Sequence, residues 1–265
     1  MTSIDNPCDT CYSNMNYTDE QLKRRFKELA DKAYSRNICT FTNFLGLLEL
    51  NTFYETAKDL SFAVYHLYGG ADFCDRQVVR FGTSEMPYPI DCLHVTPSLK
   101  KFSDALTHRD FLGAMINLGI KREMLGDIIV RDNEAFVFCI HTISDFIIQN
   151  LDRVKHTTVK CSLSEEIPDQ SYITIVRREF NVASLRLDAI VGEICKLSRS
   201  QAQTTLREKK VFINGRLTEN NSYHVKPEDT ITVRGFGKFI LTDDIRATKK
   251  GRFFITVQLY SDSYR

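Results

Sequence analysis

The stretch LRLDAIVGEICKLSRSQAQTTLREKKVFINGRL, residues 185–217, decides the fold of the C-terminal part of the chain. Its apolar side chains first recur at helical spacing, at Leu187, Ile190, Val191 and Ile194, which predicts a helix over residues 184–196. The sequence Ser198-Arg199-Ser200-Gln201 then matches the S-x-x-Q capping box that begins a helix. We therefore expect two short helices that meet at a tight corner.

Strands are expected after this helix pair. Apolar residues alternate over residues 211–217 and run into Asn214-Gly215, the dipeptide favoured in two-residue hairpin turns. Another strand is expected over residues 230–234, and residues 240–260 are expected to form a hairpin with the basic tip Lys249-Lys250-Gly251-Arg252. The predicted unit is a helix pair with a small β-sheet.

One side of the second predicted helix is polar. Arg199, Gln203 and Arg207 are spaced by four residues and form one stripe, whereas Ala202 and Leu206 fall on the side facing the core. Guanidinium groups suit bidentate contacts with phosphate, so Arg199 and Arg207 are expected to contribute most. The same spacing also fits an ordinary solvated helix face, and the pattern alone does not choose between them.

Phosphate is also attracted by the first turn of a helix, because its backbone amides and the positive end of its dipole point the same way. The first turn of the second predicted helix contains Ser198 and Ser200. Further cations lie near it in the sequence: Arg186, Lys196, Lys209 and Lys210. We interpret this region as a candidate phosphate site.

Charge is distributed unevenly along the chain. The net charge is +1, yet residues 176–265 carry 17 Lys and Arg against 10 Asp and Glu, and the remaining 175 residues carry 18 against 24. A basic domain attracts polyanions by releasing their counterions, whereas an acidic one does not. RNA binding is therefore expected mainly in the C-terminal third.

A different order of elements precedes this third. Strands are predicted over residues 90–95, 128–130, 135–140 and 157–162, and helices over residues 109–118 and 142–151. The order βαββαβ is that of ferredoxin-like and RNA-recognition folds. Phe136 and Phe138 share one face of the third strand, where RNA readers of this type place stacking aromatics, although core packing is the more common reason for such rings.

The expected fold class is α+β multidomain. Helical spacing of apolar residues from residue 18 to about residue 71 predicts a helical N-terminal region, residues 1–83. An RNA-recognition-like βαββαβ domain is expected over residues 84–166, the helix-pair domain over residues 180–240, and a C-terminal β-hairpin extension over residues 241–265.

The C-terminal motifs resemble the RNA-binding domain named after small-subunit ribosomal protein S-four. They are Leu185-Arg186-Leu187-Asp188 and residues 197–202, 211–215 and 229–235. The resemblance implies that the helix pair docks against RNA backbone at structured junctions. With the cations around it, the expected RNA-binding set is Arg186, Lys196, Ser198, Arg199, Ser200, Gln203, Arg207, Lys209, Lys210, Arg216 and Lys238.

Lys209 departs from that family, which often has glycine at this position. A left-handed residue other than glycine costs about 1 kcal/mol. Either the bend from helix to strand is built differently here, or the extra charge compensates for the strain. The sequence leaves both alternatives open.

The middle of the chain is similar to the YlmH family of bacterial S-four-domain proteins. The similarity rests on residues 107–114, 118–123 and 126–128, with Gly235-Phe236-Gly237-Lys238 at its far end. It implies a non-enzymatic protein that binds ribosomal or transfer RNA and associates with ribosomes, through the large subunit, in translation quality control or rescue. His108, Arg109, Lys121 and Arg122 form a candidate second RNA surface, although Arg109 and Asp110 fit ion pairs within their own domain equally well.

Two other classes of function stay open. An RNA-modifying enzyme would need a cryptic active site in the first 165 residues, where no catalytic motif is recognisable; His108-Arg109-Asp110 lacks the asparagine and the glycine-rich loop of a kinase. The acidic N-terminal region could instead make this protein an adaptor that binds a protein partner. The hairpin tip at residues 249–252 is either a secondary RNA contact or an exposed basic turn.

Composition favours a cytoplasmic protein without cofactor, metal, membrane or small-molecule substrate. The eight cysteines are scattered mainly through apolar stretches, as expected of reduced thiols. Cys8 and Cys11 form a C-x-x-C pair, but no second pair follows to complete a zinc site. No apolar run is long enough to span a bilayer, and the N-terminus has no export signal.

Overall fold

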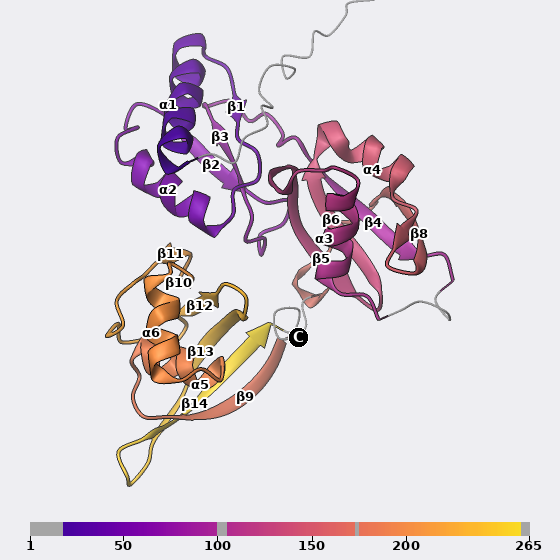
Figure 1. Ribbon diagram of the computed structural model, residues 1–265. Helices are drawn as coiled ribbons and strands as arrows, with labels where there is room; N and C mark the ends of the chain where they lie inside the picture. Colours follow the sequence, from indigo (N-terminus) through magenta and orange to yellow (C-terminus); the bar gives the residue numbers. More distant parts are fainter. Residues whose placement is uncertain (1–17, 100–104, 173–174, 261–265) are drawn as a thin grey trace, which may run out of the picture.

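The computed structural model describes residues 18–99, 105–172 and 175–260, and this part of the chain forms three lobes, each with its own sheet (Figure 1). An N-terminal lobe and a middle lobe pack against each other, and a C-terminal lobe follows through a linker that contains the short helix η4 (Gln170–Tyr172). The mixture of helices and antiparallel sheets confirms the α+β class. Within the described residues, no helix is long and apolar enough to cross a membrane.

The N-terminal lobe consists of α1 (Asp19–Arg36), α2 (Leu47–Ala57) and a sheet in the order β1-β3-β2, with strands β1 (Thr40–Phe41), β2 (Tyr65–Tyr68) and β3 (Val78–Phe81). Both helices are as expected, and Phe26, Phe53 and Phe81 fill the core between them and the sheet. The expectation of helix up to about residue 71 is wrong. Residues 65–68 pair with β3 instead, and their two tyrosines are residues that suit a strand.

The middle lobe has the predicted βαββαβ order. It runs β4 (Ile90–Pro97), α3 (His108–Asn117), η2 (Arg122–Met124), β5 (Leu125–Arg131), β6 (Glu134–Ile140), η3 (His141–Ile143), α4 (Ser144–Asn150), β7 (Arg153–Val154) and β8 (Thr157–Leu163). The antiparallel sheet has the order β5-β6-β4-β8-β7. Helices α3 and α4 pack on one face of it through Phe111, Met115 and Ile147.

The N-terminal lobe covers the opposite face of that sheet. Phe138 of β6 packs there with Phe44 and Val78 of the N-terminal lobe. Arg76 joins the two lobes with hydrogen bonds from its backbone N to Asp127 Oδ2 (3.0 Å), from Nε to the carbonyl of Leu125 (2.9 Å) and from Nη2 to the carbonyl of Phe44 (3.0 Å). The middle lobe is therefore buried on both faces of its sheet.

The C-terminal lobe consists of β9 (Ile175–Val182), α5 (Leu187–Ile194), α6 (Arg199–Arg207), β10 (Val211–Ile213), β11 (Arg216–Leu217), β12 (Thr230–Val233), β13 (Gly237–Ala247) and β14 (Phe253–Tyr260). Its sheet has the order β11-β10-β12-β13-β14-β9. The turn between β10 and β11 is the expected one, with Asn214 and Gly215 both at positive φ (50° and 75°). Helices α5 and α6 lie over one face of this sheet (Figure 1).

The hairpin expected as a separate extension over residues 241–265 is instead part of this lobe. The expected boundary falls inside β13, which pairs with β12, and β14 pairs with β9 from the start of the lobe. Ile255, Val257 and Leu259 are buried in the same core as α5 and α6. A central strand must be paired on both sides, and β14 supplies that pairing for β13.

Candidate nucleic-acid interface

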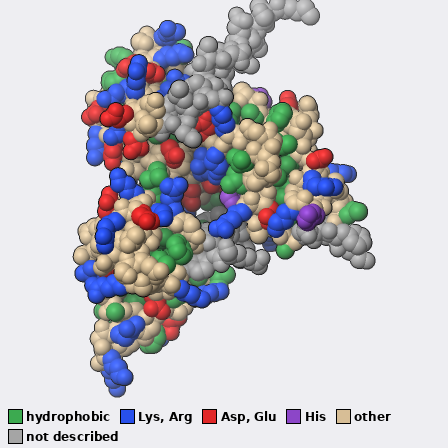
Figure 2. Space-filling model, viewed as in Figure 1, with side chains coloured by type: hydrophobic (Ala, Val, Ile, Leu, Met, Phe, Trp, Pro, Cys, Tyr) green, Lys and Arg blue, Asp and Glu red, His purple; other side chains and the backbone are tan. Residues whose placement is uncertain are grey.

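The polar stripe predicted on the second helix lies on the solvent side of α6. Arg199 and Arg207 are exposed and Gln203 is half-buried, whereas Ala202 and Leu206 are completely buried. Lys and Arg side chains also gather where the three lobes face one another (Figure 2).

The start of α6 has the predicted capping box. The Ser198 hydroxyl accepts a hydrogen bond from the Gln201 backbone N (3.3 Å), and Gln201 Oε1 accepts one from the Ser198 backbone N (2.9 Å). The Ser200 hydroxyl lies 3.1 Å from that of Ser198. The capping box uses the backbone N–H groups of Ser198 and Gln201. An anion at this end of α6 would therefore bind the backbone N–H groups of Arg199 and Ser200, which lie between them.

Asp188 joins three of the predicted residues. Its carboxylate accepts two hydrogen bonds of 3.0 Å from Arg186, at Nε and Nη2, and one of 3.4 Å from Gln203 Nε2. Arg199 Nε lies 3.9 Å from Asp188 Oδ2. A bidentate pair of this type fixes the plane of a guanidinium, so Asp188 holds Arg186 in place next to the stripe on α6.

Asp188 is itself only 2% exposed. The hydrogen bonds from Arg186, followed by those from Gln203 and the charge of Arg199, hold the pKa of the Asp188 carboxyl below its usual range in spite of burial. Its place in the first turn of α5 also favours the ionised form. The contacts of Asp188 with α6 were not predicted; the spacing Arg186-x-Asp188 at the start of a helix was the available signal.

Three predicted lysines lie at the C-terminal ends of the two helices. Lys196 follows α5 and Lys209 follows α6, both exposed, and Lys210 forms an ion pair of 2.6 Å with Glu208. Lys209 has a φ of 57°, so the bend from helix to strand has the left-handed geometry that the family builds with glycine. The alternative of a differently built bend is therefore wrong.

Two further predicted residues are directed toward the N-terminal lobe. The Arg216 guanidinium lies 4.0 Å from the centre of the Tyr54 ring of α2, and the backbone N of Leu217 donates to Asn51 Oδ1 (3.2 Å). Lys238 Nζ forms an ion pair of 2.8 Å with Asp75. The structure does not group Arg216 and Lys238 with the α6 stripe, because both take part in contacts between lobes.

The candidate second surface in the middle lobe is partly structural. Arg122 Nη1 donates to the carbonyls of Leu125 (2.7 Å) and Gly126 (3.1 Å). Burial and the nearby Arg76 lower the pKa of Arg122 to about 10. Burial, together with the charges of Arg122, Arg109 and Arg76, lowers the pKa of His108 to about 4, so this imidazole is neutral at pH 7.

The other two members of that set are more accessible, because Arg109 is exposed and Lys121 half-buried. Asp110 accepts hydrogen bonds from Thr107 and forms an ion pair of 2.9 Å with Lys155, so it is paired inside its own lobe. Arg109 and Lys121 are therefore the members of this surface that an RNA could reach most easily.

Phe136 and Phe138 are core residues. Phe138 is 1% exposed beneath Gly70, and Phe136 is 9% exposed, stacked on His94 with ring centres 4.5 Å apart and meeting the Tyr172 ring edge-on. The sheet face that stacks bases in RNA-recognition folds is thus covered by protein.

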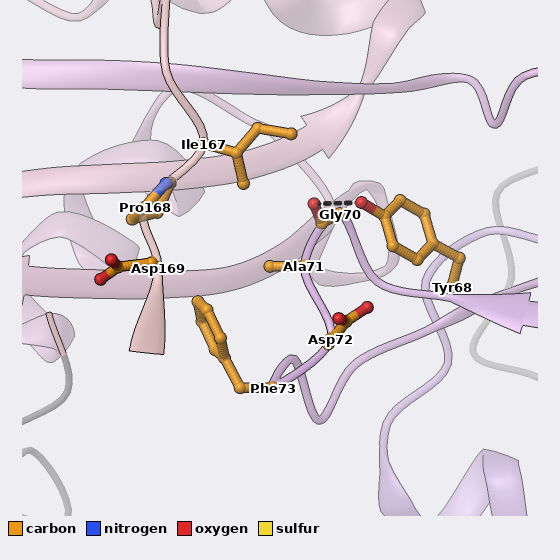
Figure 3. Close-up of a pocket in the computed structure, with 8 residues that line it drawn as sticks. All are labelled: Tyr68, Gly70, Ala71, Asp72, Phe73, Ile167, Pro168 and Asp169. Atoms are coloured by element: carbon orange, nitrogen blue, oxygen red, sulfur yellow. Dashed lines mark hydrogen bonds between the residues drawn. The ribbon is translucent and has the colours of Figure 1, made fainter. Parts of the chain in front are cut away.

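A pocket of about 430 Å³ adjoins this covered face (Figure 3). Tyr68, Ala71 and Phe73 line one side of it, and Ile167 and Pro168 of the linker line the other. The charged side chains in its lining are those of Asp72 and Asp169. Their charge would repel a phosphate, so this pocket is not part of the RNA surface.

No group of His, Cys, Asp and Glu side chains suited to a metal ion is found in the part of the chain that the structure describes. The candidate pair Cys8 and Cys11 lies outside the described residues.

Two family models match the chain. Residues 85–167 match the model described as "Putative RNA-binding domain in YlmH", and residues 185–231 match the S4 domain. The chain thus carries a YlmH-type RNA-binding domain followed by an S4 domain. The middle lobe contains the first domain, and the C-terminal lobe contains the second together with β9, β13 and β14. The surface formed by α5 and α6, with Arg186, Arg199, Gln203 and Arg207, is called the α5–α6 surface. It therefore lies on an S4 domain.

The chain also resembles a curated relative and a solved structure. The chain is 31% identical over 158 residues to "Ribosome-associated protein quality control protein P2" of Bacillus subtilis (strain 168), an alignment that covers 58% of this chain and 60% of that protein. The match thus spans about three fifths of the length of the relative. The structure of "Cell division protein ylmH from Streptococcus pneumoniae" is 20% identical, covers 58% of this chain and 94% of that one, and has a TM-score of 0.45.

Proposed function

We propose that this protein is a non-enzymatic RNA-binding protein that binds structured ribosomal RNA on the large subunit, in translation quality control or rescue. Its contact surface is the α5–α6 face, with Arg186, Arg199, Gln203 and Arg207 at its centre. The main support is the arrangement of the arginines on this face. Asp188 orients Arg186 next to α6, which exposes the guanidinium groups of Arg199 and Arg207. The remaining contacts of this surface are Lys196, Ser198, Ser200, Lys209 and Lys210.

The partner is inferred from the chemistry and from the relative. Arginines with fixed planes and a helix start suit phosphate groups held at a defined geometry, as in folded RNA. The name of the Bacillus subtilis relative states that it is ribosome-associated and acts in protein quality control. Transfer RNA bound next to the large-subunit site is part of the same proposal.

The decisive experiment is charge reversal on α6. We expect the double variant Arg199→Glu/Arg207→Glu to bind purified large-subunit ribosomal RNA roughly 100-fold more weakly, with a salt dependence reduced by about two phosphate contacts. The matched control is Arg24→Glu/Lys27→Glu on the exposed face of α1, which changes net charge equally. Equal affinities of the two double variants, both folded, would refute the site.

Sedimentation with ribosomal subunits tests the partner. The wild-type protein is expected to co-sediment with the large subunit at moderate salt, and the α6 double variant to remain free. Co-sedimentation with the small subunit alone would reject the proposed partner while leaving RNA binding intact.

A second function, contact with a protein, is favoured by an apolar patch on the N-terminal lobe. Tyr34 is 69% exposed and meets Phe62 edge-on at 5.5 Å; Ile38 and Val64 are also exposed, and both adjoin Gly82. Exposed apolar clusters mark interaction sites. We expect Tyr34→Ser/Phe62→Ser to weaken binding to intact ribosomes but not to protein-free ribosomal RNA. Equal binding of this variant and the wild type to ribosomes would exclude the second function.

A further inference from the structure

A pocket of about 360 Å³ lies beside the α5–α6 surface, between α5, the start of α6 and the turn that joins β13 to β14. Its lining includes the buried Gly192, the half-buried Ala189 and five charged groups on three separate segments: Arg186, Asp188 and Glu193 at α5, Arg199 at α6, and Arg252 in the turn. Pockets of this size are typical of sites for small organic groups.

Arg252 reaches this pocket although it lies outside residues 185–231, which match the S4 model. Pairing of β14 with β9 places Phe253 opposite Val182, at the point where the chain enters α5. The Arg252 guanidinium donates from Nη2 to the carbonyl of Asn181 (2.8 Å) and from Nε to Asn181 Oδ1. Because a guanidinium carries several N–H donors, this anchoring is compatible with further hydrogen bonds to a ligand.

The charges in the pocket favour a nucleotide over an isolated phosphate. Asp188 is paired with Arg186 and also lies 3.9 Å from Arg199, so Glu193 is the remaining carboxylate of a lining that it shares with Arg199 and Arg252. A free phosphate would be repelled by Glu193, whereas the edge of a base presents N–H donors to a carboxylate and acceptors to arginine. The Ala189 and Gly192 wall offers an apolar surface for the flat face of a base.

We propose that this pocket holds one unpaired nucleotide of the bound RNA, with its phosphate on Arg199 and Arg252 and its base edge on Glu193. The β13–β14 turn is thereby an RNA-contacting element of this chain, through Arg252. This inference rests on the proposed function and names the part of the RNA that the C-terminal lobe recognises. Unpaired, unstacked bases are the features that proteins read most readily in structured RNA.

Binding of large-subunit ribosomal RNA to Arg252→Gln tests the role of Arg252. The control is Lys250→Gln, in the same exposed turn but outside the pocket. We expect roughly tenfold weaker binding for Arg252→Gln and less than about twofold for Lys250→Gln. Because Arg252 also anchors Asn181, thermal unfolding of each variant is measured in parallel. Equal affinity of the two folded variants would overturn the inference.

Two substitutions that leave the arginines in place test occupancy. Ala189→Leu fills the pocket without a change of charge and is expected to weaken RNA binding roughly tenfold with an unchanged salt slope. Glu193→Gln removes a negative charge, so a site for phosphate alone predicts tighter binding, and a site for a base edge predicts weaker binding. Wild-type affinity of Ala189→Leu, or tighter binding by Glu193→Gln, would reject the nucleotide.

Failure of this inference is distinguishable from failure of the proposed function. If Arg199→Glu/Arg207→Glu abolishes binding while Arg252→Gln and Ala189→Leu bind normally, only the pocket is refuted. If all these folded variants bind as the wild type does, the α5–α6 surface is refuted together with it.

Discussion

Lys196 and Lys209 occupy equivalent places at the ends of α5 and α6, and both have left-handed backbone conformations, with φ of 54° and 57°. Each is followed by a residue that bonds back across the last turn: Leu197 N donates to the carbonyl of Gly192 (2.8 Å), and Lys210 N to that of Thr205 (3.3 Å). This is the Schellman ending, in which glycine is the favoured residue. The chain thus has lysine at two strained positions next to the proposed RNA surface.

Replacement of either lysine by glycine is expected to stabilise the protein. Lys196→Gly and Lys209→Gly should each raise the free energy of unfolding by about 1 kcal/mol, because glycine adopts positive φ without strain. The control is Lys58→Gly after α2, where φ is −61° and no such gain is expected. Urea unfolding measures all three, and a Lys209→Gly protein no more stable than Lys58→Gly contradicts the prediction.

The pair Asp188–Arg186 is expected to contribute to stability as well as to orientation. Asp188→Asn removes the charge from the bidentate pair and should lower the free energy of unfolding by about 1 to 3 kcal/mol at neutral pH. The control is Asp19→Asn, because Asp19 is an exposed carboxylate in the first turn of α1. Its loss of stability measures the effect of the helix dipole without that of the Asp188–Arg186 pair. Similar losses in the two variants would assign the effect to the dipole alone.

The contribution of Asp188 has a defined pH dependence. Its folded-state pKa is lowered, so the stabilisation is complete above the unfolded pKa of about 4 and is lost as pH falls below it. The difference in unfolding free energy between the wild type and Asp188→Asn should therefore be constant from about pH 5 to 8 and shrink under more acidic conditions. Denaturant titrations at several pH values provide the measurement, and a difference that grows on acidification would contradict the assignment.

Local signals predicted the parts of the fold that local interactions build. The capping box at Ser198, the Asn214-Gly215 turn and the βαββαβ order all depend on residues a few positions apart, and all are confirmed. The strand at residues 65–68 was missed because its partner is β3, and its own residues do not specify that pairing.

Contacts between lobes could not be predicted from spacing. Arg216 and Lys238 were grouped with the α6 stripe because they are cations in the same domain, but their contacts are Tyr54 and Asp75 in another lobe. For the hairpin tip that contains Arg252, the sequence leaves open a secondary RNA contact or an exposed basic turn, since only the pairing of β14 with β9 places Arg252 near α5. The charge of a residue is readable from sequence, whereas the surface on which it lies depends on long-range pairing.

Gly70 is expected to be essential for the packing of the N-terminal lobe on the middle sheet. It has a φ of 102°, and a Cβ there would overlap the ring of Phe138. Gly70→Ala should therefore cost about 3 kcal/mol or more of stability. Gly113→Ala is the opposite case: it lies on the exposed side of α3 with open space around it, so alanine should stabilise by up to about 1 kcal/mol. Thermal unfolding of both variants checks the contrast, and equal effects would argue against the tight contact.

His108 is expected to make the stability of the protein sensitive to mild acid. The pKa of His108 is about 4 in the folded state, because burial and three neighbouring arginines disfavour its charged form, whereas an unfolded histidine has a pKa of about 6.5. As pH falls from about 6.5 to 4, the unfolded chain takes up a proton at this residue and the folded chain does not. Stability should then fall by as much as about 1.4 kcal/mol per pH unit, and His108→Gln should lose this part of the slope.

Urea unfolding between about pH 7 and 4.5 measures that slope, and the NMR titration of the His108 imidazole measures the folded pKa directly. The same shift bears on RNA binding, because a histidine that is neutral from pH 6 to 8 contributes no charge to a phosphate contact. The salt dependence of RNA binding in that range should therefore be the same for His108→Gln and the wild type, while Arg109→Gln reports whether the exposed cation of this surface takes part. The prediction is contradicted if the His108 imidazole titrates near pH 6.5, or if the unfolding free energy of His108→Gln depends on pH as steeply as that of the wild type. Either result would show that the neighbouring arginines do not lower the pKa of His108.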